Sequence, residues 1–230
     1  MAIAILNWCF VVAQIAVVIR MRRTCFKTFL VALVLSSLQA ANVNLGDHLT
    51  GAPARSWSEY FWRGFWSPLE TILLIYTAAA VIEAIFVVTE SSSQRWWIRV
   101  TCIGMPALIW CVTALFFVPL DAGDIYHTFL RIREFIWIGN ALALSALWLF
   151  LLFRPDWRRN VPRLALRHAA TFLALALSYA VIGPLRTMLD DTGWLNVQAV
   201  SRTIMIGCCA AWVFLAAGAR KANGAPHAAV

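Results

Sequence analysis

The chain has 230 residues, of which 62% are hydrophobic, and it carries a formal net charge of +8. This apolar share exceeds the ~45–50% of a soluble globular domain, and the apolar residues form continuous runs, which excludes an outer-membrane β-barrel. The connections between the runs are shorter than the ~50 residues that a soluble domain typically needs, so no basic face is left outside the membrane for nucleic acid.

Seven apolar runs follow one another along the chain, each close to the ~20 residues that a helix needs to cross a bilayer. They predict an all-α polytopic membrane protein, a single bundle of seven transmembrane helices within residues 1–221. The predicted spans are residues 2–19, 28–42, 68–89, 100–118, 135–153, 164–182 and 195–218. Residues 222–230 are expected to form a short disordered tail.

The distribution of positive charge predicts the orientation of the bundle. Thirteen of the 19 Lys and Arg residues follow spans one, three, five and seven, while six lie on the other side. Positive residues accumulate in the cytoplasmic loops of membrane proteins. The N-terminus is therefore expected outside and the C-terminus in the cytoplasm.

The start of the third span carries two features of helix beginnings. Residues Ser67 and Glu70 match a capping box with Pro68 at the first helical position, so Glu70 is expected to cap this span. Just before it, the aromatic segment 57–66 has two interpretations. It is either an interfacial helix on the outer leaflet or an extension of the third span.

Three polar side chains fall well inside the apolar runs: Glu83, Gln14 and His168. Ionisable groups at such depth are costly and are candidates for function. Two interpretations of Glu83 stay open at this point. Its carboxyl group either ties helices together by hydrogen bonds, or it serves as a proton relay or coupling-ion ligand.

Polar residues gather at the predicted outer ends of spans five, six and seven. We expect an outward-facing polar pocket that binds a polar or anionic ligand through Arg131 and Arg202. The candidate pocket residues are Arg131, Glu134, Asn140, Tyr179, Gln198 and Arg202. The alternative is that these are ordinary helix ends reaching water.

Metal and cofactor chemistry is weakly signalled. Asp121, Asp124 and His127 have a spacing that can place oxygen and imidazole ligands on one side of a turn, although Asp124 can equally cap a helix. The six cysteines form no CxxC motif, and the seventh span has no Lys for a retinal Schiff base. We expect no cofactor and no metal site.

Residues 60–90, an aromatic run leading through Trp66 into an apolar helix, and residues 129–153, a basic start before an apolar span, carry a resemblance. They resemble segments of uncharacterised seven-helix integral membrane proteins of soil bacteria. The resemblance implies a bacterial inner membrane and transfers no functional residue.

These observations favour a non-enzymatic membrane sensor or accessory subunit with an outward-facing polar pocket. One alternative is a small-solute or proton-coupled transporter that uses Glu83. Another is a membrane enzyme acting on a lipid substrate through Asp124 and His127. Expected partners are the lipid bilayer and either a cytoplasmic protein or anionic lipid at the basic loops, with no nucleic acid; the sequence makes no prediction of oligomeric state.

Overall fold

A computed structural model describes residues 2–22, 24–50, 67–90, 92, 95–104, 106–108, 111, 125–186 and 191–224 of the chain. Almost all of these residues are helical. The long helices are α1 (Ala2–Met21), α2 (Lys27–Thr50), α4 (Ser67–Thr89), α7 (Ile125–Phe153), α9 (Arg163–Arg186) and α10 (Asp191–Gly224). The short ones are α5 (Arg95–Arg99), the π-helix η3 (Val100–Gly104) and α8 (Pro155–Asn160).

Four helices in the described ranges are long and apolar enough to cross a membrane. These segments are Pro68–Thr89, Arg133–Phe153, Arg163–Ile182 and Asn196–Ala216. The apolar stretches Ile5–Met21 and Lys27–Ala41 are shorter. Large apolar side chains stay exposed on the outside of the bundle, such as Phe153 at 79% and Phe214 at 76%, as expected where lipid replaces water. The predicted all-α fold is therefore confirmed, with four described helices that are long and apolar enough to span a membrane.

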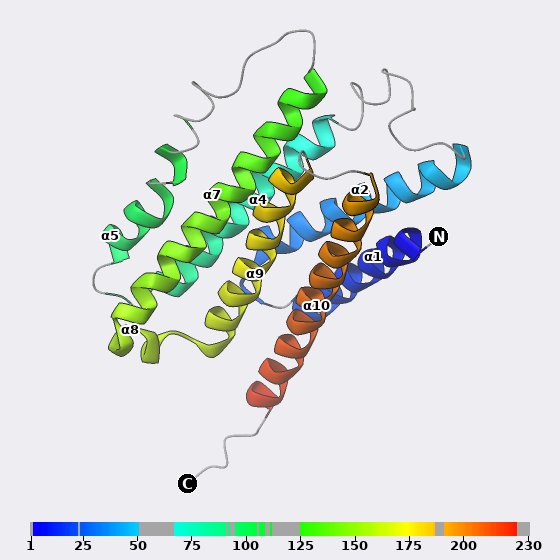
Figure 1. The fold of residues 1–230 in the computed structure, drawn as a ribbon. Coiled ribbons are helices and arrows are strands. Elements are labelled where there is room, and N and C mark those ends of the chain that lie inside the picture. The colour runs from blue at the N-terminus through cyan, green and yellow to red at the C-terminus, as the bar shows by residue number, and fades with distance from the viewer. Residues whose placement is uncertain are drawn as a thin grey trace.

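Contacts link the six long helices in a ring within the described part of the chain, and α4 also contacts α9 across it. Helix α1 packs on α2, α2 on α4, α4 on α7, α7 on α9, α9 on α10, and α10 returns to α1. In Figure 1, α7, α9 and α10 run side by side, while α1 and α2 incline across one side of them. Helix α5 contacts α4 and η3 contacts α7, both on the outside of the ring.

Several helices are longer than the apolar runs that predicted them. Helix α2 continues to Thr50 instead of ending at residue 42, and α7 begins at Ile125, ten residues before the predicted start. A helix satisfies its own backbone hydrogen bonds, so polar residues can continue it beyond the apolar run. The predicted interfacial segment 57–66 and most of the predicted span 100–118 lie outside the described residues.

The start of the predicted fourth span has an irregular backbone. The π-helix η3 ends at Gly104, two residues before Pro106. Proline lacks an N–H group, and its ring clashes with the carbonyl four residues earlier, here that of Cys102. A wider π turn at this point is a recurrent way to accommodate such a break.

Candidate functional site

A cavity of about 190 Å³ lies inside the ring, and all six ring helices contribute to its wall. Asn7, Glu70, Arg133 and Arg202 line it from the N-terminal parts of α1, α4, α7 and α10, and Tyr179 lines it from the C-terminal part of α9. These ends meet at one end of the ring, which is the side predicted to face outward. We call this part of the wall the polar end of the cavity.

One ion pair crosses the polar end. Arg133 Nη1 donates to Glu70 Oε1 at 3.2 Å, and the Glu70 side chain is only 5% exposed. The sequence predicts Glu70 as a helix cap, and the structure shows that one of its carboxylate oxygens is also engaged by an arginine 63 residues later. This long-range pairing balances the two charges and joins α4 to α7.

The second arginine of the cavity, Arg202, has no carboxylate partner among the described residues. Its guanidinium carbon lies 5.0 Å from the centre of the Phe10 ring, and its Nη1 lies 3.6 Å from the sulfur of Met205. Arg202 is six residues, or about 9 Å, inside the membrane-compatible segment that begins at Asn196. With Glu70 and Arg133 neutralising each other, the described wall carries one uncompensated positive charge.

An aromatic pair stands beside these charges. The rings of Trp137 and Tyr179 stack with centroids 4.1 Å apart and an interplanar angle of 13°. Both residues line the cavity, and no hydrogen-bond partner of the Tyr179 hydroxyl lies in the described ranges. The polar end therefore offers a guanidinium and a phenol that are both available to a ligand.

The opposite part of the wall is apolar and aromatic. Phe29, Phe172 and Trp212 line the cavity and contact one another, with ring centroids 4.6 Å apart for Phe29 and Trp212 and 5.5 Å for Phe29 and Phe172. We call these three rings the aromatic floor. The cavity is thus amphipathic, with charge at one end and aromatic carbon at the other.

His168 lies behind the aromatic floor and not in the cavity wall. Its ring is fully buried, stacks on Phe26 at 3.8 Å and meets Phe29 edge-on at 4.7 Å. Neither ring nitrogen has a hydrogen-bond partner within the described part of the chain. His168 therefore acts as an aromatic packing residue in this arrangement.

Gln14 joins α1 to α2 at the side of the cavity. Its Nε2 donates to Ser36 Oγ at 2.8 Å, and its Oε1 lies 3.1 Å from the Ser37 hydroxyl. Gln14 is 2% exposed, so both ends of a buried amide are satisfied by the neighbouring helix. A buried amide with partners stabilises the contact between two helices.

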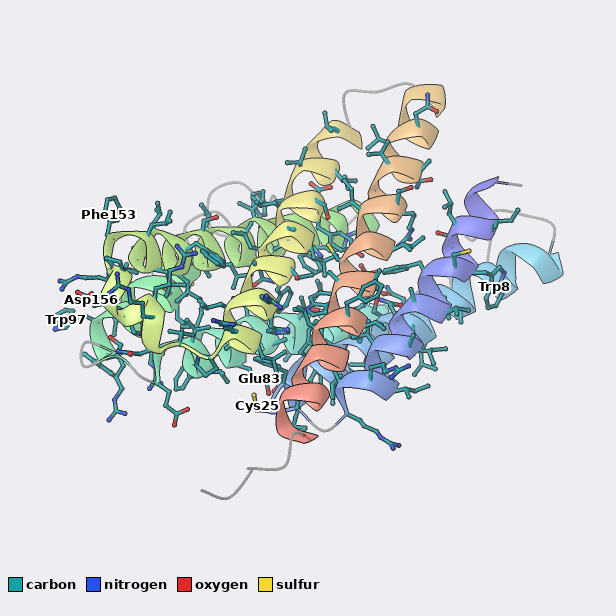
Figure 2. The ribbon with its side chains drawn as sticks, turned by 90° about the horizontal axis from the view of Figure 1, so that it is seen from below. Trp8, Cys25, Glu83, Trp97, Phe153 and Asp156 are labelled. Carbon is teal, nitrogen blue, oxygen red and sulfur yellow. The ribbon has the colours of Figure 1, made fainter. Side chains whose placement is uncertain are left out.

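Glu83 caps the beginning of another helix. Its Oε1 accepts from the Thr28 amide and its Oε2 from the Phe29 amide, each at 3.0 Å. These amides belong to the first turn of α2, whose N–H groups have no partner within the helix. Figure 2 labels Glu83, on α4, close to Cys25, which lies in the connection that leads into α2. A carboxylate at a helix N-terminus is also favoured by the helix dipole, and these contacts support the helix-tying interpretation of Glu83.

Only some residues of the predicted pocket line the cavity in the structure. Tyr179 and Arg202 line the cavity, while Glu134, Asn140 and Gln198 are not in its wall. The side chains of Arg131 and His127, and the residues Asp121 and Asp124, lie outside the described part, so the metal candidates stay untested. Where side chains are described, no group of three or more His, Cys, Asp and Glu residues could hold a metal ion.

The cavity uses residues that the sequence did not single out as ligand contacts, including Arg133, Trp137 and the aromatic floor. Arg131 and Arg133 are two residues apart, so on a helix they point about 200° apart. Which of the two arginines faces the cavity depends on how α7 is rotated about its axis. The sequence does not give that rotation, because it is set by the packing of α7 against α4. Comparison with known protein families, curated proteins and solved structures finds no match to this chain.

Proposed function

We propose that this chain is a non-enzymatic membrane sensor or accessory subunit that binds a small ligand in the cavity enclosed by α1, α2, α4, α7, α9 and α10. The observation that carries the proposal is Arg202, a cation in the cavity wall with no carboxylate partner among the described residues. An unpaired charge at this depth in a membrane is costly, and such residues are retained mainly where they serve function.

The proposed membrane arrangement has seven spans, with the N-terminus outside and the C-terminus in the cytoplasm of a bacterial inner membrane. The ion pair of Glu70 and Arg133 supports it, because it brings the beginnings of α4 and α7 together. Both helices then run in the same direction, so the chain between Thr89 and Ile125 has to cross the bundle once more. A fourth span at residues 100–118 supplies that crossing.

A route from the cavity to the cytoplasmic side runs through α2. Phe29 belongs to the aromatic floor, and its amide is held by Glu83 at the start of the same helix. Directly before this turn lies the basic connection in which Lys27 donates to the Arg22 carbonyl at 2.8 Å. A ligand that shifts Phe29 would shift the start of α2 and with it this basic connection, where a cytoplasmic protein or anionic lipid would respond.

The contacts of Glu83 weigh against a transporter in which Glu83 takes up and releases the coupling proton. Both carboxylate oxygens accept from backbone amides, so a proton taken up there would break a helix cap. The alternative of a lipid-modifying enzyme depends on Asp124 and His127 and gains no support from the described residues.

Two neighbouring cysteines provide a direct test of an open cavity. Cys209 lines the cavity, whereas Cys208 is buried without lining it. Variants that keep only Cys209 or only Cys208, with the other cysteines replaced by Ala, are exposed to 2-hydroxyethyl methanethiosulfonate in proteoliposomes. Modification of Cys209 is expected to be at least about tenfold faster, because reaction requires access as well as thiolate.

Cys208 serves as the reference for Cys209 in this experiment. The two thiols are adjacent on α10 and both are nearly buried, Cys208 at 7% and Cys209 at 2% exposure, but only Cys209 lines the cavity. Failure of the reagent to modify Cys209 in the folded protein, when the same variant is modified after denaturation, would mean that no ligand-sized path reaches the cavity, and the proposed function would be rejected.

A further inference from the structure

We propose that the ligand of this cavity is a small amphipathic monocarboxylate, with its carboxylate on Arg202 and Tyr179 and its apolar body on the aromatic floor. This inference rests on the proposed function and names the chemical class of its ligand. It follows from three properties of the described wall: its charge, the order of its side chains along the helices, and its size.

The net charge of the cavity wall favours a ligand with a single negative charge. Glu70 and Arg133 pair at 3.2 Å, which leaves the Arg202 guanidinium as the uncompensated group. A monoanion neutralises it. A dianion would leave one negative charge in excess near Glu70, and an amine would add a positive charge to a wall that already has one in excess.

The donors at the polar end fit a carboxylate. A guanidinium binds carboxylate oxygens through parallel N–H donors, and this geometry is stronger than a neutral hydrogen bond. Arg202 comes from α10 and Tyr179 from the neighbouring α9. The Tyr179 hydroxyl can donate to the same oxygen, while its ring is held in place by the stacked Trp137.

The order of side chains along the helices favours a ligand whose other end is apolar. Trp212 follows Arg202 by ten residues on α10, which is about 15 Å along the axis, and Phe172 precedes Tyr179 by seven residues on α9, about 10 Å. The wall therefore changes from charged to aromatic over the length of a small molecule. A ligand without an apolar part would leave the aromatic floor uncovered.

The size of the cavity excludes larger anions. Its volume of about 190 Å³ lies below the ~300–1,000 Å³ of pockets for drug-sized ligands. A phospholipid or a nucleotide does not fit this space, whereas a short-chain or aryl carboxylate does.

The test uses three probes of nearly the same shape and different charge. The purified protein in nanodiscs is titrated with 3-phenylpropionate, 3-phenylpropanamide and 3-phenylpropylamine by isothermal calorimetry. The carboxylate is expected to bind at least about tenfold more tightly than the amide, as a charge-assisted hydrogen bond implies, and the amine is expected not to bind. Failure of the carboxylate to bind, or equal binding of the amide or the amine, would overturn the proposal.

Two arginine variants assign the effect to Arg202. Arg202→Gln is expected to weaken 3-phenylpropionate binding at least about tenfold, and Arg202→Lys to restore part of it. Arg99→Gln is the matched control, because Arg99 also lies over a phenylalanine ring, at 4.0 Å from the Phe86 centroid, but outside the cavity. Unchanged affinity in Arg202→Gln, or an equal loss in Arg99→Gln, would contradict the assignment.

A second measurement keeps the inference testable if Arg202→Gln does not fold. In the variant with Cys209 alone, the anionic sulfonatoethyl and the cationic trimethylammonioethyl methanethiosulfonates are compared, each relative to its rate with a free thiol. The anionic reagent is expected to react faster, because Arg202 attracts it. If the neutral reagent reaches Cys209 but the cationic one reacts as fast as the anionic one, the ligand class is wrong and the proposed function stands; if the neutral reagent does not reach Cys209, both fail.

Discussion

Two polar residues that lie inside apolar runs of the sequence have different surroundings in the structure. Glu83 holds the first turn of α2 through two backbone amides, whereas His168 is enclosed by Phe26, Phe29, Phe172 and Trp212 without a hydrogen bond in the described ranges. Intramembrane polarity alone therefore does not identify a ligand site. The number and kind of hydrogen-bond partners separates a structural group from one that is available.

At the residue scale, Glu83→Gln is expected to destabilise the protein by about 1–2 kcal/mol. The amide side chain keeps one acceptor, but its NH₂ group faces a backbone N–H, so one amide of the first turn of α2 loses its cap. The free energy of unfolding, measured by equilibrium denaturation in mixed micelles, checks this. Glu90→Gln is the control, since Glu90 is exposed at the end of α4.

The same variant separates the two interpretations of Glu83. A helix cap predicts lower stability with no change in the proton dependence of ligand binding, because Glu83 does not line the cavity. Unchanged stability with altered proton dependence of ligand binding would instead revive the relay interpretation.

At the element scale, the contact between α1 and α2 is expected to depend on the amide of Gln14. In a double-mutant cycle of Gln14→Leu and Ser36→Ala, the coupling free energy is expected to be about 0.6 kcal/mol, typical of hydrogen bonds between membrane helices. The cycle isolates the bond between Gln14 Nε2 and Ser36 Oγ, which is 2.8 Å long. Equilibrium unfolding of the four proteins gives the value.

A second cycle provides the control for that coupling. Thr77 also lines the cavity, but its hydroxyl donates to the Leu73 carbonyl of its own helix at 2.8 Å. Gln14→Leu and Thr77→Val should therefore be additive. Coupling of equal size in both cycles would indicate a general change of packing and not a bond between α1 and α2.

Hydropathy predicts the elements well where they are apolar and poorly where they are not. It gives the beginning of α4 to within one residue, because Pro68 and the apolar run coincide there. It misses the first ten residues of α7 and the last eight of α2, which are helical although polar residues interrupt their apolar ones. It also predicts Tyr179 and Arg202 as polar groups at one level, but not that α4 and α7 turn Glu70 and Arg133 toward each other, which depends on packing between distant segments.

At the scale of the whole molecule, the proposed orientation in the membrane, with the N-terminus outside, can be tested at Cys25. Cys25 lies between α1 and α2, in a connection that the charge distribution predicts to be cytoplasmic. In sealed spheroplasts, a variant with Cys25 as its only cysteine should resist an impermeant maleimide and become labelled after permeabilisation. A cysteine added before Met1 should show the reverse, since the N-terminus is proposed to lie outside.

The rate of that labelling depends on pH in a defined direction. Burial raises the pKa of the Cys25 thiol, and the Glu83 and Glu90 carboxylates add to the increase, although a backbone hydrogen bond and Lys27 act against it. A raised pKa means less thiolate near neutrality, so labelling after permeabilisation should be slower than that of a free thiol at pH 7 and should accelerate as the pH rises. Labelling of Cys25 in sealed spheroplasts at any pH would reverse the orientation. The cavity, with Arg202 near its polar end, would then open to the cytoplasm, and the ligand would have to be a cytoplasmic carboxylate.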